Sequence, residues 1–353
     1  MADHDCDAVM GTDAGSAEAV VCLLCGPAVV EFSHALESAY DVRSVADTAV
    51  DAAVAELNRL VPQRDSGICV VCHSQGSTPA DSVVDLVNTL ANNPEADIAW
   101  PVPDHGSLWS PLPAVAACRA WRPDRDGPLA FRQSCWVEHG PFAAHSHALW
   151  EWVLRATAAG CSLAAQTVSR NVHASSLPDL APTRPHSDWD WLQRQLSAED
   201  VTGCEDAADA SVACRAGLLQ MHDFLEESHR FAQSIEGRGR LHDGDYWHAI
   251  MHRREPDFSN SKYWFRRVGA HPVFDGLGPV ADALLAQAAF PSASEWRSTL
   301  CGSGWDPLAF VDLCQEALST GDRDLISVAK QIQQAEMECL LGHCWNSSSD
   351  ACP

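Results

Sequence analysis

The sequence predicts an α/β domain followed by an all-α domain. Up to about residue 173, short β-branched runs alternate with longer stretches of helical periodicity, which is typical of parallel strands layered with helices. Beyond residue 188 the helical windows continue with almost no strand signal. The segment between them, SSLPDLAPTRPHS at 175–187, is rich in proline and has no periodicity, which predicts a linker.

A chain of 353 residues is long for one hydrophobic core, so two domains are expected. The expected boundaries are a flexible N-terminus over 1–18, an α/β domain over 19–174, a Pro-rich linker over 175–188, a helical domain over 189–345 and a flexible tail over 346–353. No internal repeat divides either part.

In the first domain, apolar β-branched runs mark the strands, and turn residues separate them from the helices. The clearest strand is ICVVC at 68–72, and Thr78-Pro79 opens the helix that follows it. The expected strands span 20–25, 42–46, 67–72, 96–102 and 128–132, and the expected helices span 28–40, 50–60, 81–92, 134–139 and 148–159.

In the second domain the periodicity is helical throughout. Pro256 is expected to end one helix, and Asp257 or Ser259 to cap the next, because these side chains accept hydrogen bonds from the first free N–H groups of a helix. The expected helices span 189–196, 213–234, 245–254, 261–268, 280–290, 307–319 and 325–341.

The composition is that of an acidic globular protein. Hydrophobic residues make up 46% of the chain, and the formal net charge is −25. A negative electrostatic potential disfavours binding to nucleic-acid backbones and anionic membranes. A local basic pocket that binds a small anion is still compatible with this net charge. The acidic N-terminus lacks the positive region of a secretory signal, and no apolar run approaches the roughly 20 residues that cross a bilayer. We therefore expect a cytoplasmic protein with neither nucleic acid nor membrane as a partner.

The 15 cysteines are expected to be free thiols or metal ligands rather than disulfides. Two pairs, Cys22-x2-Cys25 and Cys69-x2-Cys72, have the spacing of a zinc ribbon. Residues three apart in a strand point to opposite faces, however, so neither pair can chelate one ion without a turn between its members. We interpret them as buried strand cysteines.

Two segments of the first domain resemble the glycosyltransferase family 2 proteins of GT-A fold. The first is ICVVCHSQGSTPADSVVDLVNTLANNPEADIAWP at 68–101, preceded by a helix. The second is GPLAFRQSCWVEHGPFAAHSHALWEWVLRATAAG at 127–160, which carries the pattern formed by Arg132, Trp136, Gly140, Phe142, Trp150, Trp152 and Arg155. The resemblance implies a Rossmann-like, GT-A-type α/β sandwich that binds a nucleotide sugar. It also implies that Arg132, Arg155, or the loop with His73 and Gln75, contacts an anionic donor.

The sequence departs from this family at both places that handle charge. Where the family has an Asp-x-Asp that holds a divalent cation, this chain has Cys72-His73-Ser74-Gln75, which contains no carboxylate. Where the family has its general base, this chain has His147, and Glu151 follows one turn later. His147 and Glu151 are therefore the candidate catalytic residues, and His145 is an alternative proton acceptor.

The second domain carries two short stripes of histidine and glutamate. The predicted helix at 213–234 places His222, Glu226 and His229 four and three residues apart, which is one stripe of a helix. The segment YWHAIMHRREPDFSNSKYWFRRVG at 246–269 repeats that spacing with the residues His248, His252 and Glu255. It resembles a segment of uncharacterised bacterial proteins, and this resemblance implies no activity.

Three interpretations of these stripes stay open. The six residues can hold a divalent metal ion, since Glu226-x2-His229 has the spacing of di-metal helical bundles. They can form a buried polar network in which Glu226, Glu227, Glu255 and Asp257 pair with the nearby arginines. They can also surround a small anionic ligand held by Arg253, Arg254, Trp247 and Trp264.

The favoured function is a nucleotide-sugar-binding or glycosyltransferase-like protein with a degenerate donor metal site and a small-molecule partner. The first alternative is a metal- or anion-binding module in the helical domain, with the α/β domain as scaffold. The second is a structural or interaction protein without catalysis. The cofactor prediction is limited to a divalent metal ion, and neither the oligomeric state nor the donor follows from the sequence.

Overall fold

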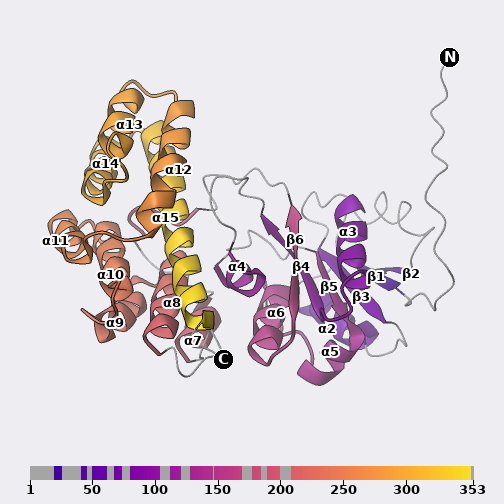
Figure 1. Ribbon diagram of the computed structural model, residues 1–353. Coiled ribbons are helices and arrows are strands. Elements are labelled where there is room, and N and C mark those ends of the chain that lie inside the picture. The colour runs from indigo at the N-terminus through magenta and orange to yellow at the C-terminus, as the bar shows by residue number, and fades with distance from the viewer. Residues whose placement is uncertain are drawn as a thin grey trace, which may run out of the picture.

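The computed structural model describes residues 20–25, 41–45, 50–61, 67–73, 80–103, 112–120, 128–145, 147–168, 177–183, 189–198 and 208–350. Within these ranges every named strand lies between residues 20 and 168, and the part from residue 189 onward is built from helices (Figure 1). The predicted order, an α/β part followed by a helical part, is confirmed. None of the helices in these ranges is long and apolar enough to cross a membrane.

The α/β part contains one six-stranded mixed sheet. Its strands are β1 (Val20–Cys25), β2 (Asp41–Val45), β3 (Ile68–His73), β4 (Ile98–Pro103), β5 (Leu129–Arg132) and β6 (Leu163–Val168), in the spatial order β2-β1-β3-β5-β4-β6. β5 runs antiparallel to β3 and β4, whereas the other neighbours are parallel. Five strands match the predicted ranges within two residues. β6 was not predicted, because LAAQTV is a short run of mostly small residues.

Helices cover both faces of this sheet. They are α2 (Val50–Leu60), α3 (Ala80–Ala91), α4 (Ala114–Ala120), α5 (Gln133–His139) and α6 (Ala148–Ala158). In β3, Ile68 and Val70 pack with α3 on one face, while Cys69 and Val71 face the core that contains α2 and α6. This alternation follows from the two-residue period of a strand. The predicted helix at 28–40 lies outside the described residues.

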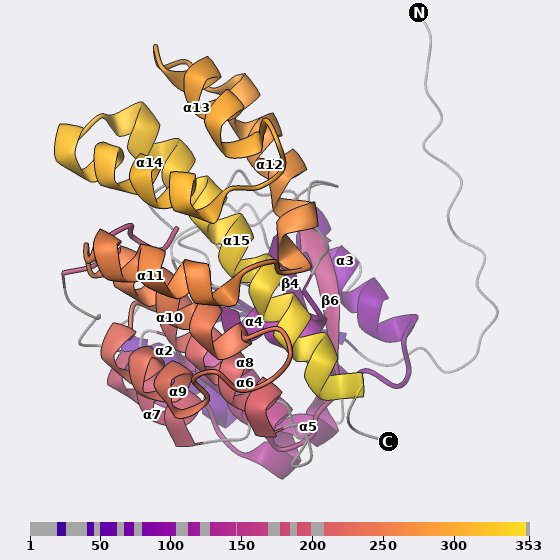
Figure 2. The ribbon, with the colours of Figure 1, turned by 60° about the vertical axis from the view of Figure 1, so that its left-hand side comes forward.

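The helical part comprises α7 (Asp190–Ala198), α8 (Ala208–Met221), α9 (Leu225–Ser234), α10 (Asp243–Arg254), α11 (Phe258–Val268), α12 (Val273–Gln287), α13 (Ala293–Cys301), α14 (Pro307–Thr320) and α15 (Arg323–Asp350). Figures 1 and 2 show α15 running along the whole of this part, where it contacts α8, α12 and α14. The predicted cap is found, since the Asp257 side chain accepts from the backbone N–H of Asn260.

Three helical predictions are wrong in their extent. The helix expected at 213–234 is broken into α8 and α9, because the chain turns at Asp223, whose φ is 66°. α12 begins seven residues before the predicted start and tolerates Pro279 inside it. α15 continues to Asp350, so a helix occupies most of the predicted flexible tail, and the Ser348 side chain is fully buried there.

The predicted linker is anchored where it is described. Leu177, Pro178 and Leu180 are buried, and the Asp179 backbone carbonyl accepts from Arg254 Nε at 3.1 Å. The Asp179 carboxylate is paired with Lys330 Nζ at 2.8 Å. Residues 177–183 therefore pack against the helical part rather than tethering it loosely.

The two parts share one hydrophobic core. Trp150 in α6 donates from Nε1 to the carbonyl of Cys118 in α4 at 2.9 Å, and its ring lies 5.6 Å from the rings of Trp189 and Trp191 and 5.5 Å from that of His222. A continuous set of buried apolar residues runs from Ala53 to Cys344 across this junction. The relative position of the two parts is consequently fixed by packing.

The contact between α8 and α10 depends on one glycine, which yields a first prediction. A Cβ atom added to Gly217 would lie 2.4 Å from Cζ2 of the fully buried Trp247 ring. The substitution Gly217→Ala is expected to lower the free energy of unfolding by about 1–3 kcal/mol, although alanine favours helices over glycine by about 1 kcal/mol. Urea unfolding measures the change. Gly276→Ala in α12 is the matched control, since its Cβ would meet nothing within 4 Å and should cost no stability.

Candidate functional sites in the two parts

The first candidate site is the edge of the sheet where β1 and β3 end. Cys25 and His73 are the last residues of these strands and are register partners. In the sheet, β1 lies between β2 and β3. The connection that leaves β1 leads to β2 on one side, whereas the connection that leaves β3 leads to β4 on the other side, so the two connections diverge. Open α/β sheets bind ligands at the carboxyl ends of strands at such a switch point. The side chain of His73, and all of Gln75, lie outside the described residues.

Arg132 does not lie at this edge. Because β5 is antiparallel to β3, Arg132 pairs with Ile68 at the opposite end of β3, which is about 17 Å from His73 along the strand. Its guanidinium donates to the backbone carbonyl of Ala96 at 2.9 Å and to that of Leu90 at 3.0 Å. Arg132 therefore ties α3 to the sheet and lies at the opposite end of β3 from His73, and its predicted contact with an anionic donor stays a prediction.

The predicted acceptor-side residues lie on α6 and its N-terminal flank. The Glu151 carboxylate is paired with Arg155 Nε at 3.0 Å, and Arg155 also donates to the carbonyls of His139 and Pro141. His147 is the N-cap residue of α6, and its ring packs edge-on against the ring of Trp189 at 5.2 Å. Arg155 thus holds the turn before α6 in place, and the catalytic roles of His147 and Glu151 stay predictions.

His145 is held beside His147 by backbone contacts. Its Nδ1 accepts from the backbone N–H of His147 at 3.1 Å, and its ring stacks on Trp191 at 5.1 Å. Burial lowers the pKa of His145, although the Glu151 charge acts in the opposite direction. A neutral imidazole with one nitrogen already engaged has only the other nitrogen left for proton transfer.

The second candidate site is a three-histidine cluster made by His229, His248 and His252. His248 and His252 are four residues apart on α10, and their rings stack with centroids 4.8 Å apart. His229 comes from α9, with its ring centroid 4.6 Å from that of His248 and 5.5 Å from that of His252. One nitrogen from each ring lies within 4.8 Å of the other two. Three of the six predicted metal ligands therefore meet.

The other three predicted ligands lie outside the cluster. The turn at Asp223 separates His222 from α9, and His222 Nε2 instead contacts the backbone carbonyl of Arg119 at 2.6 Å. Glu226 is exposed on α9. Glu255 is exposed at the rim of the cluster, with Oε2 at 3.4 Å from His252 Nδ1. The predicted stripe over 222–229 is wrong, since a single continuous helix does not exist there.

His248 and His252 are the buried members of the cluster. His248 is 2% exposed, and burial, together with the neighbouring histidines and the charge of Arg267, lowers its pKa to about 3. Burial also lowers the pKa of His252, while the Glu255 carboxylate opposes the change. The Trp264 ring stacks on His248 at 3.9 Å between centroids. His248 is accordingly a neutral ring at ordinary pH.

Arg253 and Arg254, which were predicted to bind an anionic ligand in the helical domain, are engaged in buried ion pairs. Arg253 Nη2 lies 2.5 Å from Glu336 Oε2, and Arg254 Nη2 lies 2.5 Å from Asp223 Oδ1. Arg254 also donates to the carbonyls of Gln220 and Asp179. The predicted polar network exists, but its partners are Glu336 and Asp223 rather than Glu226, Glu227, Glu255 or Asp257. No anionic ligand is needed to balance these two charges.

The two predicted ligand-binding tryptophans have different surroundings. Trp247 is fully buried against Gly217, which leaves no face of its ring for a ligand. Trp264 is 7% exposed and is covered by His248 on α10 and by Arg267, whose Cζ lies 4.5 Å from the ring centroid. Trp264 therefore belongs to the wall of the three-histidine cluster.

Two further groups among the described residues have the composition of a metal site. In the first, Asp243, His271 and His343, the His271 Nδ1 accepts from the backbone N–H of Val273, so its Nε2 carries the proton donated to Asp243 at 3.0 Å. His271 and Asp243 therefore form a hydrogen-bonded pair, whereas His343 Nε2 lies 3.5 Å from Asp243 Oδ1 and has no hydrogen-bond partner among the described residues.

The second group is Cys135, His139 and Cys161. The two sulfur atoms are 2.8 Å apart, which is closer than the roughly 3.8 Å expected for two sulfur ligands of a tetrahedral zinc ion. Burial raises the pKa values of both thiols, which disfavours the thiolate form that binds metals. As placed, these cysteines are a neutral thiol pair.

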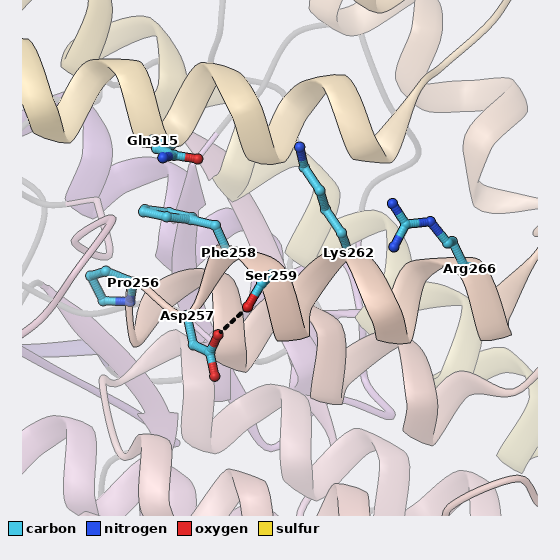
Figure 3. A pocket seen from close by; sticks show the side chains of 7 residues that line it. All are labelled: Pro256, Asp257, Phe258, Ser259, Lys262, Arg266 and Gln315. Carbon is cyan, nitrogen blue, oxygen red and sulfur yellow. Dashed lines mark hydrogen bonds between the residues drawn. The ribbon is translucent and has the colours of Figure 1, made fainter.

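An open pocket of about 530 Å³ lies between α11 and α14. Figure 3 shows Lys262 and Arg266 extending from α11 toward the helix that carries Gln315. Lys262 is paired with Asp312, and Asp257 at the other end of the pocket is occupied in capping α11. The pocket is open to solvent, and two of its three charged side chains, Lys262 and Asp257, are already engaged, so it is a weaker candidate than the histidine cluster.

Sequence reasoning missed the partners that lie far away along the chain. Glu336 is 83 residues from Arg253, and nothing in the QIQQAEMECLL run around it marks it as an ion-pair partner. Asn260, whose Nδ2 lies 3.0 Å from His252 Nε2, is eight residues away and follows the helix break at Pro256. The i,i+4 spacing of His248 and His252 was the one local signal that found the cluster.

Comparison with known proteins adds little. No protein-family model and no curated protein matches the sequence. Among solved structures, the chain is similar to the mannosyltransferase PcManGT from Pyrobaculum calidifontis in complex with GDP-Man and Mn²⁺, at 12% identity over 93% of this chain and 88% of that chain, with a TM-score of 0.34. It is also similar to S. aureus TarS 1–349, at 8% identity over 86% of this chain and 92% of that chain, with a TM-score of 0.29. TM-scores of this size support no conclusion about fold or activity.

Proposed function

We propose that the α/β part binds a nucleotide sugar, and that the protein is glycosyltransferase-like, with a GT-A-type sheet whose donor site lacks the usual acid pair. The observation that carries the proposal is the position of His73 at the carboxyl end of β3, beside the end of β1 at the switch point of the sheet. The resemblance of residues 68–101 to family 2 glycosyltransferases supports the same edge as the donor site.

The backbone at this edge suits a phosphate. α3 begins at Ala80, shortly after β3 ends at His73, so its N-terminus follows the same edge of the sheet. The free N–H groups and the partial positive charge of a helix N-terminus favour an anion there. An imidazole at His73 and an amide at Gln75 add hydrogen-bond donors without adding charge. Arg132 lies at the opposite end of β3.

The chemistry of the loop indicates metal-independent binding. Cys72, His73, Ser74 and Gln75 supply no carboxylate, and a hard divalent cation prefers carboxylate oxygen ligands. The donor diphosphate would be held by neutral donors and by the helix N-terminus. Binding is therefore proposed to need no Mn²⁺, and sugar transfer, with His147 or Glu151 as base, is the further step that an acceptor screen would examine.

A thermal-shift panel of UDP-, GDP-, ADP- and CDP-sugars, each with and without Mn²⁺, tests the proposal. One nucleotide class is expected to stabilise the protein with or without Mn²⁺, by about 2.7 kcal/mol at a hundred times its Kd. His73→Ala is expected to abolish most of the shift. Glu95→Ala is the matched control, because Glu95 is exposed in the turn before β4, at the opposite edge, and should leave the shift unchanged.

Two results would contradict nucleotide binding at this edge. The absence of a shift with all four nucleotide classes would leave the α/β part as a scaffold. A shift that survives His73→Ala but is lost in Glu95→Ala would place the ligand elsewhere on the sheet. A thermal shift that requires Mn²⁺ would support nucleotide binding but contradict the proposal that binding needs no metal ion.

A further inference from the structure

We propose that His229, His248 and His252 form a three-histidine site for a divalent transition-metal ion, with Zn²⁺ as the expected ion, between α9 and α10. The inference is independent of nucleotide binding, since the three residues lie in the helical part and none of them belongs to the sheet.

The arrangement of the rings is close to that of a metal site. One nitrogen of each histidine lies within 4.8 Å of the other two. Zinc binds imidazole nitrogen at about 2.0–2.1 Å, which places two tetrahedral ligands roughly 3.3 Å apart. Zinc binding would therefore require the nitrogens to approach one another by up to about 1.5 Å. His248 and His252 supply one face of α10, and His229 supplies the facing side of α9.

A structural hydrogen-bond network does not account for His248. Buried polar atoms are normally paired, and one left unpaired costs roughly 1–3 kcal/mol. His248 is 2% exposed, yet its Nδ1 has no hydrogen-bond partner. Its neighbours are two further imidazoles, the Trp264 ring and the cationic Arg267, none of which is a carboxylate. A bound cation would satisfy the nitrogens that the protein leaves unpaired.

The ligand set selects the class of ion. Three imidazoles are neutral nitrogen ligands, which suit Zn²⁺ and its neighbours among the transition metals and do not suit Mg²⁺ or Ca²⁺. A site with three protein ligands keeps a fourth position for water or another exchangeable ligand. His229 is partly exposed, so that position can open toward solvent at the α9 side.

Residues around the cluster supply the contacts that orient such ligands. His252 Nε2 lies 3.0 Å from Asn260 Nδ2, and with the amide turned its oxygen can accept from this nitrogen. Ligating histidines commonly use their second nitrogen for a bond of this kind. The Trp264 ring stacks on His248 and restricts the orientation of its plane. The three rings are thus carried by α9 and α10, and α11 contributes the two residues, Asn260 and Trp264, that contact them.

Metal titration of the full-length protein, purified without a histidine tag and with its thiols reduced, tests the inference. Isothermal titration with Zn²⁺ is expected to show one saturable site with a dissociation constant in the micromolar range or tighter. Co²⁺ is expected to give visible ligand-field bands without the near-ultraviolet charge-transfer bands that thiolate ligands produce. The spectroscopic readout separates this cluster from the cysteine-containing group.

The informative variant is His229→Ala, because His229 is only partly buried and its loss should leave the fold intact. Its affinity for Zn²⁺ is expected to fall by more than about 100-fold, since removing even an outer-shell partner costs roughly 10–100-fold. The Zn²⁺ affinity of the Asn260→Ala variant is expected to fall by about 10–100-fold. His343→Ala is the matched control, since it removes one histidine of the group with Asp243 and His271 and should leave the affinity unchanged.

Three outcomes would overturn the inference. These are no saturable binding at micromolar Zn²⁺, unchanged binding in His229→Ala, or Co²⁺ spectra with thiolate charge-transfer bands. Loss of binding in His343→Ala with retention in His229→Ala would move the site to Asp243. His248→Ala is not needed, so a failure of that buried variant to fold does not affect the test.

Discussion

Replacing Glu336 with leucine is expected to lower the free energy of unfolding by about 3–5 kcal/mol, the range found when one partner of a buried ion pair is removed. Glu336 and Arg253 both have side chains with no exposure, and their closest atoms are 2.5 Å apart. Tyr246 donates its hydroxyl to the other Glu336 oxygen at 3.2 Å. Leucine fills much of the same volume, so the loss would come from the charge left on Arg253.

Arg253 has little else to compensate for that loss. Its Nε and Nη1 atoms are buried with no hydrogen-bond partner, so Glu336 is the acid that neutralises it among the described residues. The Phe310 ring, 4.4 Å from Cζ, offers only a cation–π contact. Such a contact is worth about 2 kcal/mol when desolvated, which is less than the cost of the unpaired charge.

Urea unfolding followed by far-ultraviolet circular dichroism measures the effect, with two controls. The double variant Arg253→Met with Glu336→Leu is expected to recover most of the stability, because it removes both charges. Asp282→Ala breaks an exposed pair with Arg297 and is expected to cost far less stability than Glu336→Leu, because water screens exposed charges. A loss below about 1 kcal/mol in Glu336→Leu would show that the arginine finds another partner.

The folded protein is also expected to lose stability at alkaline pH. Burial raises the pKa of the Cys118 thiol and that of the Cys314 thiol from 9.0 to about 12. The unfolded chain releases these two protons from about pH 9, whereas the folded chain keeps them up to about pH 12. The unfolded state therefore binds fewer protons in this window, and stability falls as the pH rises.

The size of this effect follows from the two pKa values. Between pH 9 and pH 11 each thiol is expected to remove roughly 2 kcal/mol, since each pH unit of full difference in protonation is worth about 1.36 kcal/mol, so the pair removes roughly 4–5 kcal/mol. Below pH 9 both states keep the proton and the full contribution is present. Burial and then the Glu336 charge raise the pKa of Tyr246 as well, which acts in the same direction.

Urea midpoints at several pH values between 8 and 11 check the slope. In the variant Cys314→Ala the stability should fall less steeply than in the parent protein, because one of the two titrating groups is gone. The same slope in both proteins would mean that Cys314 ionises without resistance in the folded state. Working under reducing conditions keeps disulfide formation from contributing.

The local sequence determined the elements with strong periodicity and the faces that they bury. The two-residue alternation in β3 and the helical periodicity of α2 and α6 follow from nearest-neighbour geometry, so their bounds were predictable within a residue or two. The i,i+4 spacing of His248 and His252 likewise places both residues on one face of α10, because a helix turns once in 3.6 residues. The N-cap at Asp257 was predictable for the same reason, since its partner is three residues away.

Only the tertiary structure decided which side chains meet. Because the chain turns at Asp223, His222 lies at the junction with α4, whereas His229 lies beside His248 and His252 of α10. Antiparallel pairing put Arg132 at the far edge of the sheet, and α15 brought Glu336 to Arg253 across 83 residues. Spacing along a helix is set by its pitch, whereas contacts between elements depend on packing that no local pattern encodes.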